Sequence, residues 1–167
     1  MKFWWGKIIF QPIGTIHTPY IDEAPYQPLK DDKGEFYIVL QETLTPALES
    51  LNRFKYIYII YYINKLSKTP NLKINPPWIK NIQIGLFASR APNRPNPIGL
   101  SIVQLKKIEK NIIYTSGLDV FDNTPLLDIK PYIQELDAKL DANNGWLNFE
   151  NKEDQDHLLL HIKGIPH

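Results

Sequence analysis

The chain has 167 residues, of which 43% are hydrophobic and 22% charged, and its formal net charge is +1. This length suits one compact domain with a core of its own, and the composition excludes global disorder. The absence of cysteine excludes disulfides, thiolate metal sites and cysteine nucleophiles.

The N-terminal residues 1–7 contain an apolar stretch that is too short for a signal peptide or a membrane span. We therefore expect a single domain over residues 1–167, a cytoplasmic location and no membrane partner.

Short apolar runs rich in β-branched and aromatic residues alternate with turn residues, which is typical of an antiparallel sheet or barrel. The expected strands, in chain order, are residues 7–11, 36–40, 56–63, 82–88, 100–106, 112–120 and 126–131. The fifth and sixth should form a hairpin through residues 107–111. Because residues 56–63 are apolar on both faces, we expect that strand at the centre of the sheet.

Helix is expected in only one or two short segments. Thr45 and Pro46 supply an N-cap and a first-turn proline for a helix over residues 47–51. Residues 154–163 form a second candidate, in which an alternating pattern competes with the helical one. The loops at 19–33 and 66–80 are rich in proline and should be surface segments of the kind that often cover a site.

Two of the three arginines, Arg90 and Arg94, lie in one loop with three prolines, residues 89–97, although sixteen of the nineteen basic residues are lysine. A planar guanidinium suits a carboxylate, a phosphate or a purine edge. Proline stiffens the loop, so little ordering entropy is lost on binding. The pattern predicts a ligand-binding loop, and the alternative is a plain surface crossover.

Basic residues are unevenly distributed along the chain. Residues 50–108 contain ten bases and no acid, so the remainder carries nine bases against eighteen acids, a balance of 9 − 18 = −9. This distribution predicts a positive face suited to a phosphate backbone. Scatter of these bases over the folded surface is the alternative.

Residues 122–125, Asp-Asn-Thr-Pro, have turn chemistry between two apolar strands. They can be a plain turn or a grip for a polar cofactor head, and Asp119, Asp122 and Asp128 could offset a cationic ligand. No GxGxxG, P-loop, HExxH or GxSxG motif occurs, so a conventional βαβ nucleotide site is excluded. We expect His17 to be a packed or capping residue and no metal site to be present.

These motifs resemble the TsaA-like family, the tRNA-methyltransferase O group. The resemblance rests on residues 13–20, 85–90, 94–101 and 122–132, in that order, and runs from about residue 13 to residue 148. It implies a mainly β, single-sheet antiparallel β-barrel with one or two short helices, outside the Rossmann-type methyltransferases, that binds S-adenosylmethionine. It also implies a homodimer and methyl transfer to N6 of threonylcarbamoyladenosine next to the tRNA anticodon.

The resemblance also implies a set of cofactor contacts. They are Pro25, Tyr26, Gln27, Asn64, Lys65, Arg90, Leu100, Asp122, Asn123, Thr124 and Pro125. Where many members have Pro-Arg-Gln and His-Gln, this chain has Pro25-Tyr26-Gln27 and Asn64-Lys65.

The substrate nitrogen must lose a proton during or after methyl transfer, and we expect a carboxylate such as Asp119 or Asp122, or else solvent, to accept it. The candidate tRNA contacts are Arg94, Lys65 and Lys68, and Arg94 could instead brace its own loop. Two other functions remain open: a non-catalytic barrel that binds S-adenosylmethionine or RNA, and a methyltransferase acting on a small molecule. The exposed edge of the barrel and the aromatic residues Phe3, Trp4 and Trp5 are candidate dimer contacts.

Overall fold

The computed structural model describes residues 8–25, 28, 32–66, 69–76, 82–147 and 152–162. The strands in these ranges are β1 (Gly14–His17), β2 (Tyr37–Leu40), β3 (Tyr56–Tyr62), β4 (Lys73–Ile74), β5 (Ile84–Gly85), β6 (Ile98–Glu109), β7 (Ile112–Thr115) and β8 (Thr124–Pro131). The helices are α1 (Gln134–Asp137), α2 (Lys152–Ile162) and four 3₁₀ helices, η1 (Glu42–Leu48), η2 (Leu51–Arg53), η3 (Leu86–Ala88) and η4 (Gly145–Leu147).

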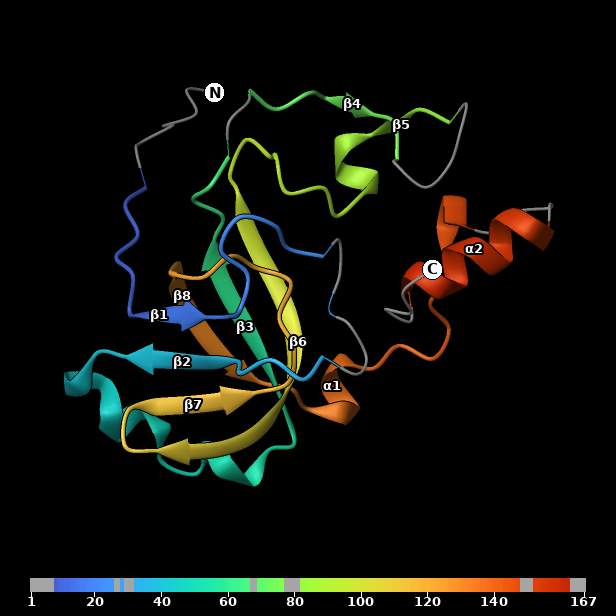
Figure 1. Ribbon diagram of the computed structural model, residues 1–167. Helices are drawn as coiled ribbons and strands as arrows, with labels where there is room; N and C mark the ends of the chain where they lie inside the picture. The colour runs from blue at the N-terminus through green and yellow to red at the C-terminus, as the bar shows by residue number, and fades with distance from the viewer. Residues whose placement is uncertain are drawn as a thin grey trace, which may run out of the picture.

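Six strands form a closed antiparallel barrel in the order β1-β2-β7-β6-β3-β8 (Figure 1). Ile16 of β1 lies opposite Ile38 of β2 on one side and Thr124 of β8 on the other, so β1 closes the ring. The expected mainly β class with antiparallel pairing is confirmed. The expectation of a single sheet needs a correction, because β4 and β5 form a separate two-stranded sheet.

The barrel interior is filled by the inward side chains of the strands. In β3, Ile57, Ile59 and Tyr61 are buried, whereas Tyr56 and Tyr62 are exposed. Each fully buried aliphatic side chain contributes about 1.5–3 kcal/mol relative to an exposed one. As expected, β3 has a neighbour on each side, β6 and β8, but only one of its faces is buried in the core.

The strand boundaries differ from the expected ones where the pattern was weak. Residues 8–11 are not a strand, and strand pairing begins only at Gly14. The side chains of Ile8 and Phe10 are exposed, so this segment gains no burial from pairing with the barrel. Of the expected strand at 82–88 only β5 is extended, since the chain then turns into η3. The strand expected at 112–120 ends at Thr115, and the hairpin between β6 and β7 is confirmed.

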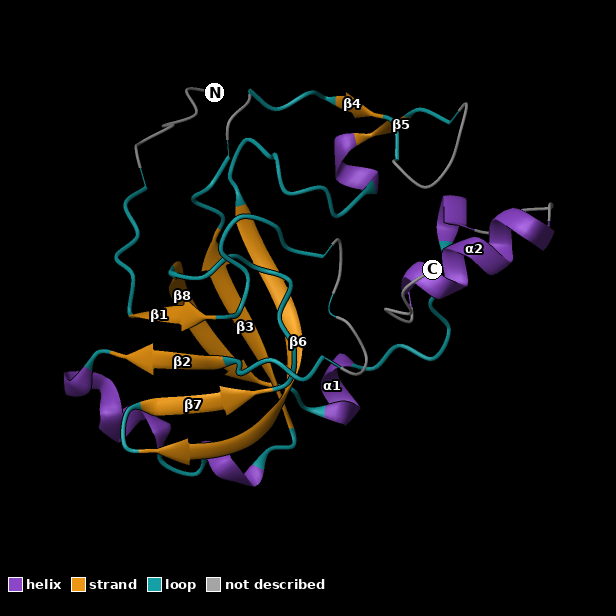
Figure 2. Cartoon of the chain, in the orientation of Figure 1, coloured by secondary structure: helices purple, strands orange, loops and turns teal. Residues whose placement is uncertain are grey.

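The helical segments lie at the periphery of the barrel, and α2 lies farther from it (Figure 2). The segment around Pro46 is 3₁₀ helix rather than α-helix, and it begins at Glu42 with Pro46 inside it. The expected C-terminal helix is confirmed as α2. Within the described ranges, no helix has the length and apolar character needed to cross a membrane.

Gly99 allows a close approach between β3 and β6. It lies opposite Tyr61 in the barrel, and a Cβ at this position would overlap the Tyr61 ring. The ring cannot move aside easily, because it is 7% exposed and its hydroxyl lies 3.2 Å from Ser101 Oγ. Gly99 is therefore required for the placement of Tyr61.

We predict that Gly99→Ala destabilises the protein by about 1–3 kcal/mol, the usual cost of overpacking a core. Gly85→Ala is the matched control, since a Cβ there meets nothing within 4 Å and its φ is −66°. Urea denaturation measures both free energies of unfolding. Equal stability of the two variants would contradict the role given to Gly99.

Candidate functional site

Three segments that are far apart in sequence meet at one end of the barrel. The hydroxyl of Thr18 donates to the carbonyl of Val120 at 2.8 Å, and the N–H of Asp122 donates to the carbonyl of Tyr20 at 2.7 Å. From a third segment, Lys65 Nζ donates to the carbonyl of Ile21 at 3.0 Å and lies 5.0 Å from the Phe121 ring centroid. The ammonium of Lys65 therefore connects both loops.

The carboxylate of Asp122 is fully engaged in holding its own turn. Its Oδ1 lies 3.0 Å from His17 Nδ1 and accepts a hydrogen bond from the N–H of Thr18 at 3.2 Å. Its Oδ2 accepts from Asn123 Nδ2 at 2.6 Å. His17 also stacks on Tyr37 with ring centroids 4.9 Å apart, which agrees with the expected packed or capping role of His17.

The geometry of the turn from Asp122 to Pro125 explains its residue types. Asn123 has a φ of 64°, a left-handed conformation that asparagine tolerates better than most residues. The buried hydroxyl of Thr124 donates to the carbonyl of Phe121 at 2.7 Å. The turn is therefore rigid on its inner side.

Asp119 differs from Asp122 in its surroundings. Burial raises the pKa of the Asp119 carboxyl, and a hydrogen bond with its own backbone and the charge of Arg90 offset this only in part. Burial, with a smaller contribution from the Asp119 charge, raises the pKa of Tyr61 to about 12. A half-buried carboxyl, a phenol and a guanidinium therefore influence one another at this end of the barrel.

The two arginines of the proline-rich loop have different environments. Arg94 Nη1 donates to the backbone carbonyls of Ser89 at 2.9 Å, Leu86 at 3.4 Å and Ala91 at 3.4 Å. Arg90 is exposed, and no hydrogen bond or ion pair to the described part of the chain engages its side chain. Arg94 therefore braces the loop, while the guanidinium of Arg90 remains accessible to a ligand.

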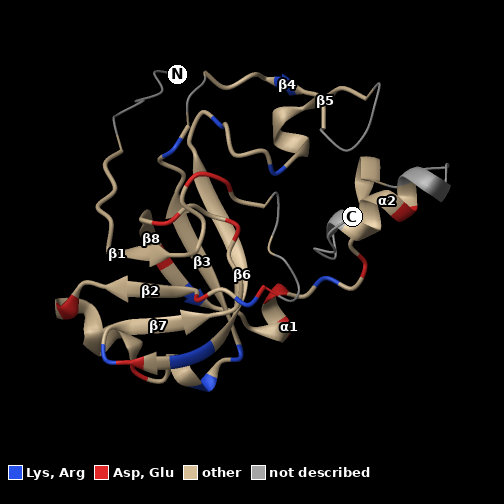
Figure 3. Ribbon diagram, in the orientation of Figure 1, with Lys and Arg blue, Asp and Glu red and all other residues tan. Residues whose placement is uncertain are grey.

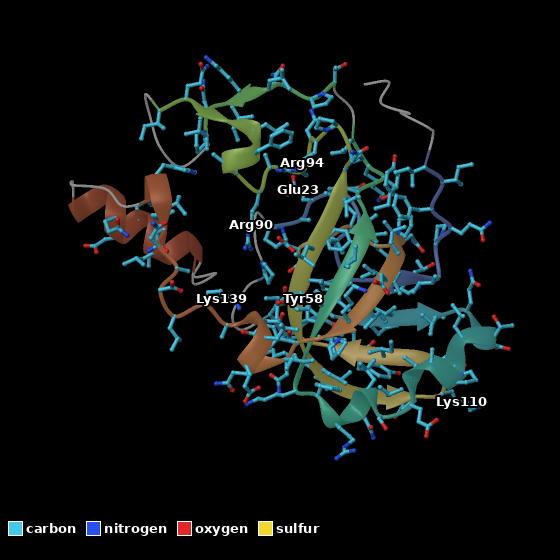
Figure 4. The ribbon with its side chains drawn as sticks, turned by 180° about the vertical axis from the view of Figure 1, so that it is seen from behind. Glu23, Tyr58, Arg90, Arg94, Lys110 and Lys139 are labelled. Carbon is cyan, nitrogen blue, oxygen red and sulfur yellow. The ribbon has the colours of Figure 1, made fainter. Side chains whose placement is uncertain are left out.

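The described basic residues are divided between two parts of the molecule. Arg90 and Arg94 lie at the same end of the barrel as Glu23, whereas Lys110 lies at the opposite end (Figure 4). A second group of basic residues follows the far end of β6 and the adjacent η2 (Figure 3). The expected single positive face is therefore wrong, because the strands carry these bases to both ends of the barrel.

The remaining predicted site residues are placed as follows. Pro25 is half-buried in the loop after β1, and Asn64 is exposed beside Lys65. Leu100 is exposed on the outer face of β6, opposite Ile60. Tyr26, Gln27 and Lys68 lie outside the described residues. The structure thus brings Lys65 together with the loop that carries the Asp122 turn, and charge links Arg90 to Asp119.

Sequence reasoning did not assign a role to Trp146 or Ser101. Trp146 Nε1 donates to the carbonyl of Ala88 at 2.7 Å, which ties η4 to η3 just before Arg90. The sequence signals were present, since Ser101 ends the motif at 94–101 and Trp146 belongs to the Gly145-Trp146-Leu147 segment. In the described ranges, no group of three His, Asp or Glu residues could hold a metal ion.

The fold and the site define a small antiparallel β-barrel protein with a cluster of polar and charged side chains at one end. The model of the tRNA-methyltransferase O N-terminal domain matches residues 15–138, and the chain belongs to this family.

Relatives in three organisms match most of the chain. A probable S-adenosyl-L-methionine-binding protein of Pyrococcus abyssi is 36% identical over 142 residues, covering 84% of this chain and 76% of its own length. Human tRNA (adenine(37)-N6)-methyltransferase is 36% identical over 157 residues, which are 90% of this chain but 36% of the human protein. The crystal structure of TrmO from Pseudomonas aeruginosa is similar with a TM-score of 0.69 and 32% identity, over 84% of this chain and 63% of that one.

The raised pKa of Asp119 predicts a pH dependence of stability. The folded carboxyl keeps its proton to a higher pH than the unfolded one, so the protein loses stability as pH rises from the unfolded pKa through the folded pKa. Asp119→Asn removes this loss. The free energy of unfolding of Asp119→Asn, relative to the parent, should therefore increase as pH rises above about 4, the ordinary pKa of an aspartate, as measured by urea denaturation. A difference that is flat with pH would contradict the raised pKa.

Proposed function

We propose that the chain is an S-adenosylmethionine-dependent methyltransferase that modifies N6 of threonylcarbamoyladenosine next to the tRNA anticodon. Family membership and the names of the relatives support this proposal. The observation that supports it most directly is the combination of an accessible Arg90 guanidinium, whose charge acts on the half-buried Asp119, with the hydrogen-bonded Asp122 turn. Because the chain spans only about a third of the human protein, the assignment of the full activity rests on this site.

The residues at this end of the barrel fit S-adenosylmethionine, which supplies an electrophilic methyl group. Arg90 suits a carboxylate, because a guanidinium presents two parallel N–H donors to it. The charge of Asp119 favours a nearby cation such as a sulfonium. The rigid turn from Asp122 to Pro125 supplies backbone groups at a fixed position.

Asp119 is the better candidate for the proton acceptor. The oxygens of Asp122 already accept hydrogen bonds from the turn and lie next to His17, whereas burial makes the Asp119 carboxylate a stronger base than an ordinary aspartate. Arg94 is assigned to bracing the loop, and Lys65 to connecting the two loops beside the turn.

We predict that Arg90→Ala weakens S-adenosylmethionine binding by about 10- to 100-fold, the loss of a charge-assisted hydrogen-bonded pair. Calorimetry measures the affinity, and transfer of a radiolabelled methyl group to total tRNA, followed by nucleoside analysis, measures the activity. Lys110→Ala, at the opposite end of the barrel, is the control and should keep both values.

Unchanged affinity and methylation in Arg90→Ala would overturn the assignment of that residue. Binding of S-adenosylmethionine without methyl transfer by the parent protein would favour a sensor. Methyl transfer to a small molecule but not to tRNA would favour the third candidate function.

A homodimer through the outer face of β3 and β6 is part of the proposal. Ile98, Leu100 and Ile102 are exposed on β6, and Tyr62 is exposed on β3 opposite Ile98. Adjacent apolar side chains on a barrel wall favour a protein contact. A barrel edge is not available, because every barrel strand has two neighbours, and the aromatic residues at 3–5 lie outside the described residues.

We predict that Ile102→Asp shifts the protein from dimer to monomer, because a charge would be buried in the contact. Size-exclusion chromatography with light scattering measures the mass. Ile8→Asp is the control, since Ile8 is exposed but lies outside the β3–β6 face. A parent protein that is monomeric at all concentrations, or a dimeric Ile102→Asp variant, would exclude this interface.

A further inference from the structure

The short helix η3 uses only one of its large side chains for folding. Leu86 is 2% exposed and packs inside, whereas the next residue, Phe87, is 75% exposed. An isolated exposed apolar side chain is common on protein surfaces and needs no explanation by itself. The surroundings of Phe87 distinguish it from such a residue.

Phe87 lies on a segment that several hydrogen bonds hold rigid. The Ser89 hydroxyl donates to the carbonyl of Leu86 at 2.8 Å, and Trp146 Nε1 donates to the carbonyl of Ala88 at 2.7 Å. Arg94, which donates to three carbonyls of this segment, places its guanidinium carbon 5.5 Å from the centroid of the Phe87 ring. An exposed aromatic ring is thus fixed in position before any partner binds.

Basic residues lie close to Phe87 along the chain and in the neighbouring β4–β5 sheet. Arg90 follows three residues later, and Lys73 on β4 lies opposite Gly85, two residues before Phe87. No acidic residue occurs between residues 50 and 108. A ring flanked by cations suits a partner with flat apolar faces and negative charge, which describes single-stranded RNA.

We propose that Phe87 is a stacking surface for an unpaired base of the RNA substrate. The proposal rests on the proposed function and adds a substrate contact to it. In this proposal the base packs on the exposed ring, and Arg94 supports the ring through a cation–π contact. Arg90, three residues after Phe87, and Lys73, opposite Gly85, are the candidate contacts for the flanking phosphates.

Three variants test this proposal. Stacking on an aromatic side chain is worth about 1–3 kcal/mol per base, so Phe87→Ala should raise the KM for tRNA about 5- to 150-fold. Phe87→Tyr keeps the ring and should stay within about twofold of the parent. Leu72→Ala is the matched control, because Leu72 is a large apolar residue that is 72% exposed. It also lies beside η3, since its carbonyl accepts a hydrogen bond from the N–H of Leu86.

Steady-state methylation of tRNA measures KM and kcat, calorimetry measures the Kd for S-adenosylmethionine, and fluorescence anisotropy measures tRNA binding without methyl transfer. Support requires weaker tRNA binding in Phe87→Ala with unchanged S-adenosylmethionine affinity and unchanged melting temperature. An equal effect of Leu72→Ala would overturn the proposal, as would a change in oligomeric mass on Phe87→Ala, which would indicate a second copy as the partner.

Failure of the proposed function is distinguishable from failure of this inference. If the parent protein binds tRNA without methylating it, the proposed activity is wrong, and the anisotropy comparison of Phe87→Ala with Leu72→Ala still decides whether Phe87 contacts RNA. If the parent methylates tRNA and Phe87→Ala keeps the parent KM, the stacking proposal alone is wrong.

Discussion

The contact on which the candidate site depends most is the bracing of the proline-rich loop by Arg94. Three prolines between residues 92 and 97 provide no N–H donors, so backbone carbonyls in this region need other partners. Arg94 Nη1 donates to the carbonyl of Ser89 at 2.9 Å and also lies 3.4 Å from the carbonyls of Leu86 and Ala91. Hydrogen bonds from a charged donor contribute about 1.5–3 kcal/mol each. Because Arg94 is committed to the loop, Arg90 remains available to a ligand.

Asp119 and Asp122 differ in the same way, because one carboxylate is engaged by its neighbours and the other is not. Both carboxylate oxygens of Asp122 are engaged, by His17, Thr18 and Asn123. These contacts fix the turn that begins β8. Asp119 is largely buried with few compensating contacts, so its charged form is disfavoured. Its carboxylate is therefore more basic than that of an ordinary aspartate. Two carboxylates three residues apart thus differ because one accepts three hydrogen bonds or ring contacts and the other is buried within reach of the Arg90 charge.

Strong local patterns made part of this structure predictable. The seven apolar residues of β3 and the alternating residues of β6 and β7 identified the hairpin and the core, since burial and periodicity coincide there. The two-residue strand β4 has too few residues to show a period, and β1 became visible only through its pairing with β2 and β8. The motifs indicated Arg90, the Asp122 turn and loop bracing as one of two roles for Arg94, but the three carbonyls that Arg94 contacts and the contact of Trp146 with Ala88 depend on tertiary geometry. Likewise, the outward direction of Leu100 follows from strand register, which residue type does not encode.

Closure of the ring by β1 has a consequence for how the chain folds. His17 and Asp122 are 105 residues apart, and the pairing of β1 with β8 joins segments equally distant. Local hairpins such as β6–β7 can form early, but contacts of high sequence separation form slowly because a long loop must close first. During synthesis, β1 leaves the ribosome long before its second neighbour exists, so its backbone must wait for β8 to be translated. The nascent chain therefore leaves the apolar side chains that face β8 unpaired until that strand, which ends at Pro131, has been made.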